Sequence, residues 1–156
     1  MQILSLFIIP LAGLLLVRLM PDSRKAMLMA LVVSLLSLAD VLLKMSGLDP
    51  AAGSQFVVDQ YWVKDLGISF YVGLDGLSMA MVLLTALLVP LIIYATSGRE
   101  INDFRNFFSL VFFMQAALYG VFTSLDGFLF YVFWELALIP IWFIVTGKHG
   151  PRRQLS

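Results

Sequence analysis

Apolar residues fill five long stretches of the chain, and polar or charged residues gather between them. A helix that spans the hydrocarbon core of a bilayer needs about 20 mostly apolar residues. Five windows come close enough to qualify, and they cover residues 3–19, 26–43, 74–96, 107–123 and 127–146. The pattern therefore predicts an all-α integral membrane protein, with about five transmembrane helices in a single membrane domain over residues 1–156.

The first window has an alternative interpretation as a secretory signal peptide. A signal peptide carries basic residues before its apolar run, but here Arg18, Arg24 and Lys25 follow the run. No small-residue cleavage site follows it either. We therefore expect the first window to be an uncleaved helix.

Residues 45–73 form the one long loop between the predicted helices. Two β-prone runs, residues 56–63 and 68–72, flank the sequence KDLG, in which Gly67 supplies a turn. This pattern predicts a small extramembrane β-hairpin. An irregular loop is the alternative.

The basic residues of the loops predict the orientation of the chain in the membrane. When the loops are assigned alternately to the two sides, eight Lys and Arg residues fall on one side and two on the other. Cytoplasmic loops carry the excess of basic residues. We therefore expect the N-terminus and the loop 45–73 outside, and the tail 147–156 inside, in what is most simply a bacterial inner membrane.

Composition agrees with a membrane protein and excludes several kinds of site. Hydrophobic residues make up 61% of the chain and charged residues 13%, against about 45–50% and about 25% in soluble domains. The chain has no cysteine and a single histidine, His149, which excludes disulfides, thiolate metal sites and a histidine metal cluster within it. We expect lipid around the chain, no nucleic-acid partner, and no metal or cofactor held by the chain itself.

Two aspartates stand just before predicted helices. Asp75 and Asp126 each precede a glycine and an apolar run. A carboxylate in that place accepts hydrogen bonds from the free N–H groups of the first turn. We therefore expect both to be helix N-caps and neither to carry chemistry.

The fifth window contains the candidate for chemistry, Glu135. In the sequence FLFYVFWELALIPIWFIV, residues 128–145, it is the one charged residue. It follows Gly127 by eight residues, which puts it roughly 12 Å into the membrane. An acidic residue at the centre of a spanning helix costs about 2.5–3.5 kcal/mol. Glu135 is therefore either a protonated or hydrogen-bonded packing group or, as we favour, a member of a proton or ion path.

The neighbours of Glu135 make a polar stripe. Pro140 has no N–H, so the carbonyl of Leu136 loses its usual helical partner, and we expect a kink there. Tyr131 and Trp142 lie on the same helix face as Glu135. Such a stripe is expected inside a helix bundle rather than against lipid.

Two further observations concern possible partners of Glu135. Gln115, in the middle of the fourth window, could line the same interior or make an interhelical packing hydrogen bond. No lysine lies mid-membrane, and Lys44 ends the second window. A cationic partner of Glu135 would therefore lie on residues outside this chain.

Three stretches together carry a resemblance to a known family. They are YWVKDLGISF at 61–70, YVGLDGLSMAMVLLTALLVPLIIYA at 71–95, and FFSLVFFMQAALYGVFTSLDGFLFYVFWELALIPIWFIV at 107–145. They resemble the antiporter-like subunits of respiratory complex I. The pattern aromatic-Glu-Leu-x-Leu-Ile-Pro around Glu135 is most similar to the M-type subunit, also called subunit 4 of NADH–quinone oxidoreductase.

The resemblance implies a function. M-type subunits have inverted helix repeats, lie in the membrane arm, and are thought to move protons with a glutamate on the fifth helix paired with a lysine on the seventh. Glu135 matches that glutamate, and the chain contains no match to the lysine. NADH, FMN, iron–sulfur clusters and quinone are expected in partner subunits. The partners would be other membrane subunits of complex I and the C-terminal helices of the same subunit.

The chain stops before a sixth helix of this family pattern, at GKHGPRRQLS. We interpret it as a truncated or split product that does not pump alone. A genuine short subunit is the alternative. Other functions also stay open: a subunit of a related cation/proton antiporter or membrane-bound hydrogenase, or a non-catalytic membrane assembly element in which Glu135 is only packed.

Overall fold

The computed structural model describes residues 2–99 and 103–146, and the predicted inner tail 147–156 lies outside them. The predicted fold class is confirmed: five long helices accompany one small antiparallel sheet. The helices are α1 (Ser5–Leu19, preceded by the 3-10 turn Gln2–Leu4), α2 (Ser23–Ser46), α3 (Gly76–Thr96), α4 (Phe104–Thr123) and α5 (Gly127–Thr146). Each described helix, with α1 counted together with its 3-10 turn, is long and apolar enough to cross a membrane.

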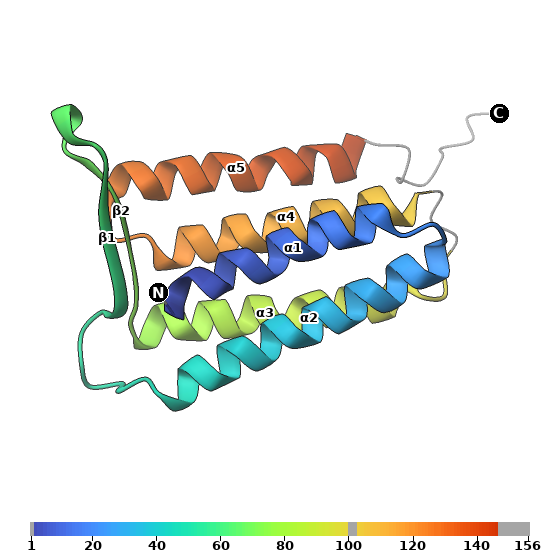
Figure 1. The fold of residues 1–156 in the computed structure, drawn as a ribbon, viewed down its shortest axis with the longest axis horizontal. Helices are drawn as coiled ribbons and strands as arrows, with labels where there is room; N and C mark the ends of the chain where they lie inside the picture. Colours follow the sequence, from blue (N-terminus) through green and yellow to red (C-terminus); the bar gives the residue numbers. More distant parts are fainter. Residues whose placement is uncertain (1, 100–102, 147–156) are drawn as a thin grey trace.

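The helices run up and down beside one another, and the sheet lies across one end of the bundle (Figure 1). We call this the hairpin end. The opposite end, here the basic end, has the two short connections α1–α2 and α3–α4. Its basic residues within the described part of the chain are Arg18, Arg24, Lys25, Arg99 and Arg105.

The sheet is the predicted β-hairpin. Strands β1 (Gln55–Val63) and β2 (Ile68–Leu74) pair antiparallel, and Gly67 turns the chain with a φ of +66°. A side chain rarely adopts that backbone conformation, which is why a glycine serves there. The hairpin also holds the link between α4 and α5, because the N–H of Leu125 donates to the carbonyl of Tyr71 at 2.8 Å.

Helix α4 is the centre of the bundle. It contacts α1, α2, α3 and α5, whereas α5 contacts mainly α4 and β2. Close approach depends on small residues at the seams: a Cβ on Gly120 would lie 2.3 Å from the ring of Phe133 on α5. A Cβ on Gly13 of α1 would lie 2.6 Å from Val33 of α2.

Polar residues fix where several helices begin. Asp75 accepts from the N–H of Ser78 at 2.8 Å, and Asp126 accepts from the N–H of Leu129 at 2.9 Å, so both predicted N-caps are confirmed. Asp103 caps α4 in the same way, through the N–H of Asn106 at 3.2 Å. The bond from the Ser78 N–H, followed by the Ser78 hydroxyl, holds the pKa of Asp75 below its ordinary value of 3.8.

Candidate functional site

Glu135 lies near the middle of α5 and faces outward. Helix α5 packs on α4 through Leu129, Ala137 and Pro140, which are buried, and through Phe133 against Gly120. These residues share one helix face, and Glu135 lies on another. Its side chain is exposed in the described structure.

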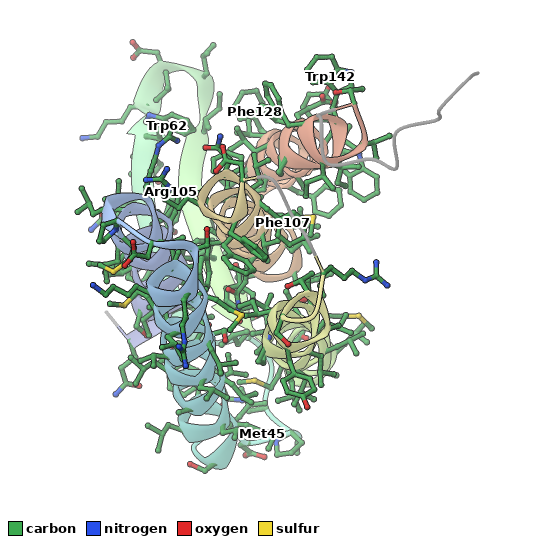
Figure 2. The ribbon with its side chains drawn as sticks, turned by 90° about the vertical axis from the view of Figure 1, so that its right-hand side faces the viewer. Met45, Trp62, Arg105, Phe107, Phe128 and Trp142 are labelled. Atoms are coloured by element: carbon green, nitrogen blue, oxygen red, sulfur yellow. The ribbon has the colours of Figure 1, made fainter. Side chains whose placement is uncertain are left out.

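The rest of the predicted stripe faces outward with Glu135. Tyr131 is 59% exposed and Trp142 is 60% exposed, and Figure 2 shows Trp142 pointing away from the other four helices. The prediction that this face lies inside the bundle is therefore wrong for the five helices described. The physical reason is that the apolar side of α5 next to Gly120 fits α4 more closely than the bulky stripe does.

A shallow groove accompanies Glu135 on this outward face. It holds about 360 Å³, and its lining residues are Phe128, Tyr131, Val132, Glu135, Leu136 and Ile139. The phenol of Tyr131 is the nearest hydroxyl along the helix, one turn from the carboxylate. The two ion pairs among the described residues are Lys25–Asp22 and Lys44–Asp40, so Glu135 has no cationic partner within that part of the chain.

Gln115 belongs to a different environment from Glu135. Its amide nitrogen donates to the hydroxyl of Ser37 at 3.2 Å and to the hydroxyl of Tyr119 at 2.9 Å, and the two hydroxyls lie 3.1 Å apart. All three side chains are buried. Of the two interpretations given for Gln115, the interhelical packing hydrogen bond between α4 and α2 is therefore confirmed. Its carbonyl oxygen is buried without a partner among the described residues.

The structure also contains a charged site that the sequence did not predict, around Lys44. Lys44 lies inside α2, its side chain only 7% exposed, and its ammonium donates to Asp40 at 2.6 Å and to the Ser5 hydroxyl at 2.6 Å. The Ser5 hydroxyl in turn lies 2.8 Å from the other oxygen of Asp40. The spacing of Asp40 and Lys44, four residues apart in one helix, was the available signal. The contact with Ser5 could not be predicted from the sequence, because it joins two different helices.

Neither Glu135 nor Asp40 lies in a cluster of potential metal ligands among the described residues. Within residues 2–99 and 103–146, no three His, Cys, Asp or Glu side chains gather as metal ligands would. A carboxylate can accept and release a proton. Glu135 presents one on the outer face of α5, whereas the carboxylate of Asp40 is engaged by Lys44 and Ser5 at the hairpin end.

Comparisons with known proteins place this geometry in a family context. No family model matches the chain. Subunit M of the F(420)H(2) dehydrogenase of Methanosarcina mazei is 42% identical over 102 residues, which is 65% of this chain and 21% of the relative. NADH-quinone oxidoreductase subunit M of Rhodobacter capsulatus is 36% identical over 133 residues, 85% of this chain and 25% of the relative. The Escherichia coli K12 subunit M is 39% identical over 89 residues, 56% of this chain and 17% of the relative.

This chain is an M-type subunit homologue. A solved structure agrees: a chain of respiratory complex I from Thermus thermophilus with bound NADH superposes with a TM-score of 0.72 at 29% identity. The match covers 90% of this chain and 27% of the solved chain. The resemblance predicted from the sequence is thereby confirmed, as is an integral membrane location. This chain spans about a quarter or less of the length of these relatives.

Proposed function

We propose that this chain is part of a membrane-arm subunit of a proton-translocating NADH–quinone oxidoreductase, and that Glu135 exchanges protons there. The observation that carries the proposal is the position of Glu135: mid-helix, on the outward face of α5, in an M-type homologue. A carboxylate facing lipid at that depth costs about 2.5–3.5 kcal/mol. Contact with a proton donor or a cation on a neighbouring helix offsets that cost.

The outward face of α5 carries two groups that can exchange a proton or a hydrogen bond with such a neighbour. The carboxylate of Glu135 accepts a proton, and the hydroxyl of Tyr131 one turn away can donate a hydrogen bond to it. By the family resemblance, the cation would be a lysine on a helix beyond this chain. Quinone, NADH, FMN and iron–sulfur chemistry belongs to partner subunits in this proposal.

One finding bears on the second candidate function, in which the chain is a subunit of a related assembly such as a cation/proton antiporter or a membrane-bound hydrogenase. The relative from Methanosarcina mazei is named as an F(420)H(2) dehydrogenase subunit, and the Rhodobacter capsulatus relative as a NADH–quinone oxidoreductase subunit. The electron donor differs between these names while the membrane subunit stays similar. The proposed role of Glu135 is the same in both settings, because it concerns protons and not the electron donor.

The test replaces Glu135 in the complete assembly by Gln, which keeps the shape of the side chain and removes its charge. Proton pumping into vesicles, followed with a pH-sensitive dye during turnover, is expected to fall at least about tenfold, because a positioned proton-transfer group contributes about 10²-fold or more. The amount of assembled complex in the membrane should stay unchanged. Asp126→Asn is the matched control, since it neutralises a capping carboxylate on the same helix. Normal pumping by the Glu135→Gln assembly would refute the proposal.

The orientation is part of the proposal. Five basic residues at the basic end, against Lys44 and Lys64 at the hairpin end, favour the hairpin end outside and the N-terminus outside. Cysteines placed at Ser54, near the hairpin, and at Ser97, after α3, should react with a membrane-impermeant reagent from opposite sides. Reaction of Ser97→Cys from the outside in intact cells would reverse the assignment.

A further inference from the structure

A groove at the basic end combines apolar walls with a charged mouth. Helices α1 and α5 lie on either side of α4 (Figure 2), and the groove of about 520 Å³ runs between them over α4. Its lining residues are Leu14, Arg18, Asn106, Ser109, Leu110, Phe113, Ile139 and Phe143. The groove is separate from the outward face that carries Glu135, apart from the shared Ile139.

The groove is closed toward the hairpin end. There the rings of Phe7 on α1 and Phe133 on α5 stack with centroids 5.7 Å apart, and Phe70 of β2 meets both rings at 6.2 and 6.5 Å. These aromatic contacts join α1 to α5. Farther along, α1 and α5 contribute Leu14, Arg18, Ile139 and Phe143 to the walls of the groove.

The lining is polar at the mouth and apolar inside. Arg18 lies in the last turn of α1 and Asn106 in the first turn of α4, so both stand at the membrane surface. Leu110 and Phe113 lie one and two turns deeper on α4. Phospholipids have this order of chemistry along the membrane normal: a charged headgroup at the surface and acyl chains below it.

The charge at the mouth selects the headgroup. Arg105 stands beside the junction of α1 and α4, where one guanidinium N–H lies 3.4 Å from the carbonyl of Met20 (Figure 2). Arg18 lines the groove, and Arg105 precedes the lining residue Asn106, so both add positive charge near the mouth. The nearby acid, Asp103, is held in the cap of α4 by the N–H and side-chain amide of Asn106. Guanidinium groups bind phosphate oxygens in bidentate fashion.

We propose that this groove binds an anionic diacyl phospholipid from the leaflet at the basic end, with its phosphate at Arg18 and an acyl chain along Leu110 and Phe113. Basic pockets between spanning helices recognise anionic headgroups. A transmembrane helix is the competing occupant. The order of the lining favours the lipid, because Arg18 and Asn106 at the mouth match a charged headgroup and the apolar residues below them match an acyl chain.

The experiment uses the complete assembly in nanodiscs and two photoreactive lipids with a diazirine on the same acyl chain: phosphatidylglycerol and phosphatidylcholine. Labelled peptides are mapped by mass spectrometry. We expect phosphatidylglycerol to label peptides from α1, α4 and α5 around the groove several-fold more than phosphatidylcholine does. Arg18→Gln should bring the phosphatidylglycerol labelling down to the phosphatidylcholine level.

Two more variants separate headgroup recognition from general charge and from the shape of the groove. Arg24→Gln removes an exposed cation at the same end but outside the groove, and should leave the labelling unchanged. Leu110→Trp fills the groove and should abolish labelling by both lipids. Equal labelling by the two lipids in the unmodified assembly, or an equal loss in Arg18→Gln and Arg24→Gln, would overturn the proposal. So would unlabelled groove peptides, which would mean that another helix covers the groove.

Discussion

Asp40 and Glu135 are both carboxylates within membrane-spanning helices, but they lie in opposite environments. Asp40 is 19% exposed on its side chain and is bound by Lys44 of its own helix and by Ser5 of α1. Glu135 is exposed on α5 and has no cationic partner among the described residues. The first acid is paired with a cation within the chain, and the second is not paired within the described residues.

The difference teaches how to separate a structural acid from a functional one in a membrane protein. A buried ion pair repays part of its desolvation cost through its own hydrogen bonds, and its removal is felt by the fold. An acid on an outward face contributes nothing to the packing of its own bundle. Under the proposed function, its presence there is explained by a partner in the complete assembly, and its removal is felt by proton pumping.

Breaking the Asp40 pair should have the largest effect on stability. Asp40→Leu leaves the Lys44 ammonium buried without a counter-charge, and we expect a loss of about 3 kcal/mol in the free energy of unfolding of the assembly in detergent. The double variant Asp40→Leu/Lys44→Met should recover most of that loss, because no unpaired charge is left. Glu135→Gln, measured beside them, should change stability by less than about 0.5 kcal/mol. A larger loss for Glu135→Gln than for Asp40→Leu would invert the comparison.

The seam between α4 and α5 offers a second, smaller test. Gly120→Ala puts a methyl group where the ring of Phe133 now lies, 2.3 Å from the new Cβ. The ring must move and α5 must shift with it, so we expect a loss of about 2 kcal/mol. Gly127→Ala is the control in the exposed first turn of α5, since its Cβ would meet nothing within 4 Å. If the two variants unfold at the same denaturant concentration, α5 is not held on α4 as described.

The smallest expected effect concerns the cap of α3. The pKa of Asp75 is lowered in the folded chain, so its charge stabilises the fold above its unfolded value of 3.8. That contribution is lost as the pH falls through the still lower folded pKa. Asp75→Asn keeps a capping side chain without a charge. The stability difference between the two, about 0.5 kcal/mol at neutral pH, should therefore shrink when unfolding is measured from about pH 6 down to about pH 3. A difference that is constant or grows would mean that the charge is not what stabilises this cap.

Much of the fold follows from local sequence signals. The bilayer sets the length of a spanning helix, so apolar runs reveal the helices without any knowledge of packing. Gly67 predicted the turn of the hairpin, and Asp75 and Asp126 predicted helix starts. Helix α2 is longer than its apolar window because Arg24 and Lys25 lie in its first turn, where long side chains reach the membrane surface.

The candidate site depended on contacts between distant residues, and these were less predictable. A period of 3.6 residues placed Tyr131 and Trp142 on the face of Glu135, but it did not reveal which face of α5 meets α4. That choice is made by the fit between Gly120 and Phe133. Lys44 looked like the end of a helix because its partner Ser5 lies 39 residues away in the sequence. Gln115 has Ser37 as its partner for the same kind of reason, at a separation of 78 residues.

The hairpin has a mechanical consequence for α5. Its strand β2 is bonded to the chain link just before α5, through Tyr71 and Leu125, and its residue Phe70 touches Phe133 on the helix itself. Any tilt or rotation of α5 must therefore stretch these attachments or drag the hairpin with it. The position of the surface hairpin is therefore tied to the position of the helix that carries Glu135. A binding protein clamped onto the hairpin from the water side would damp the motion of that helix without entering the membrane.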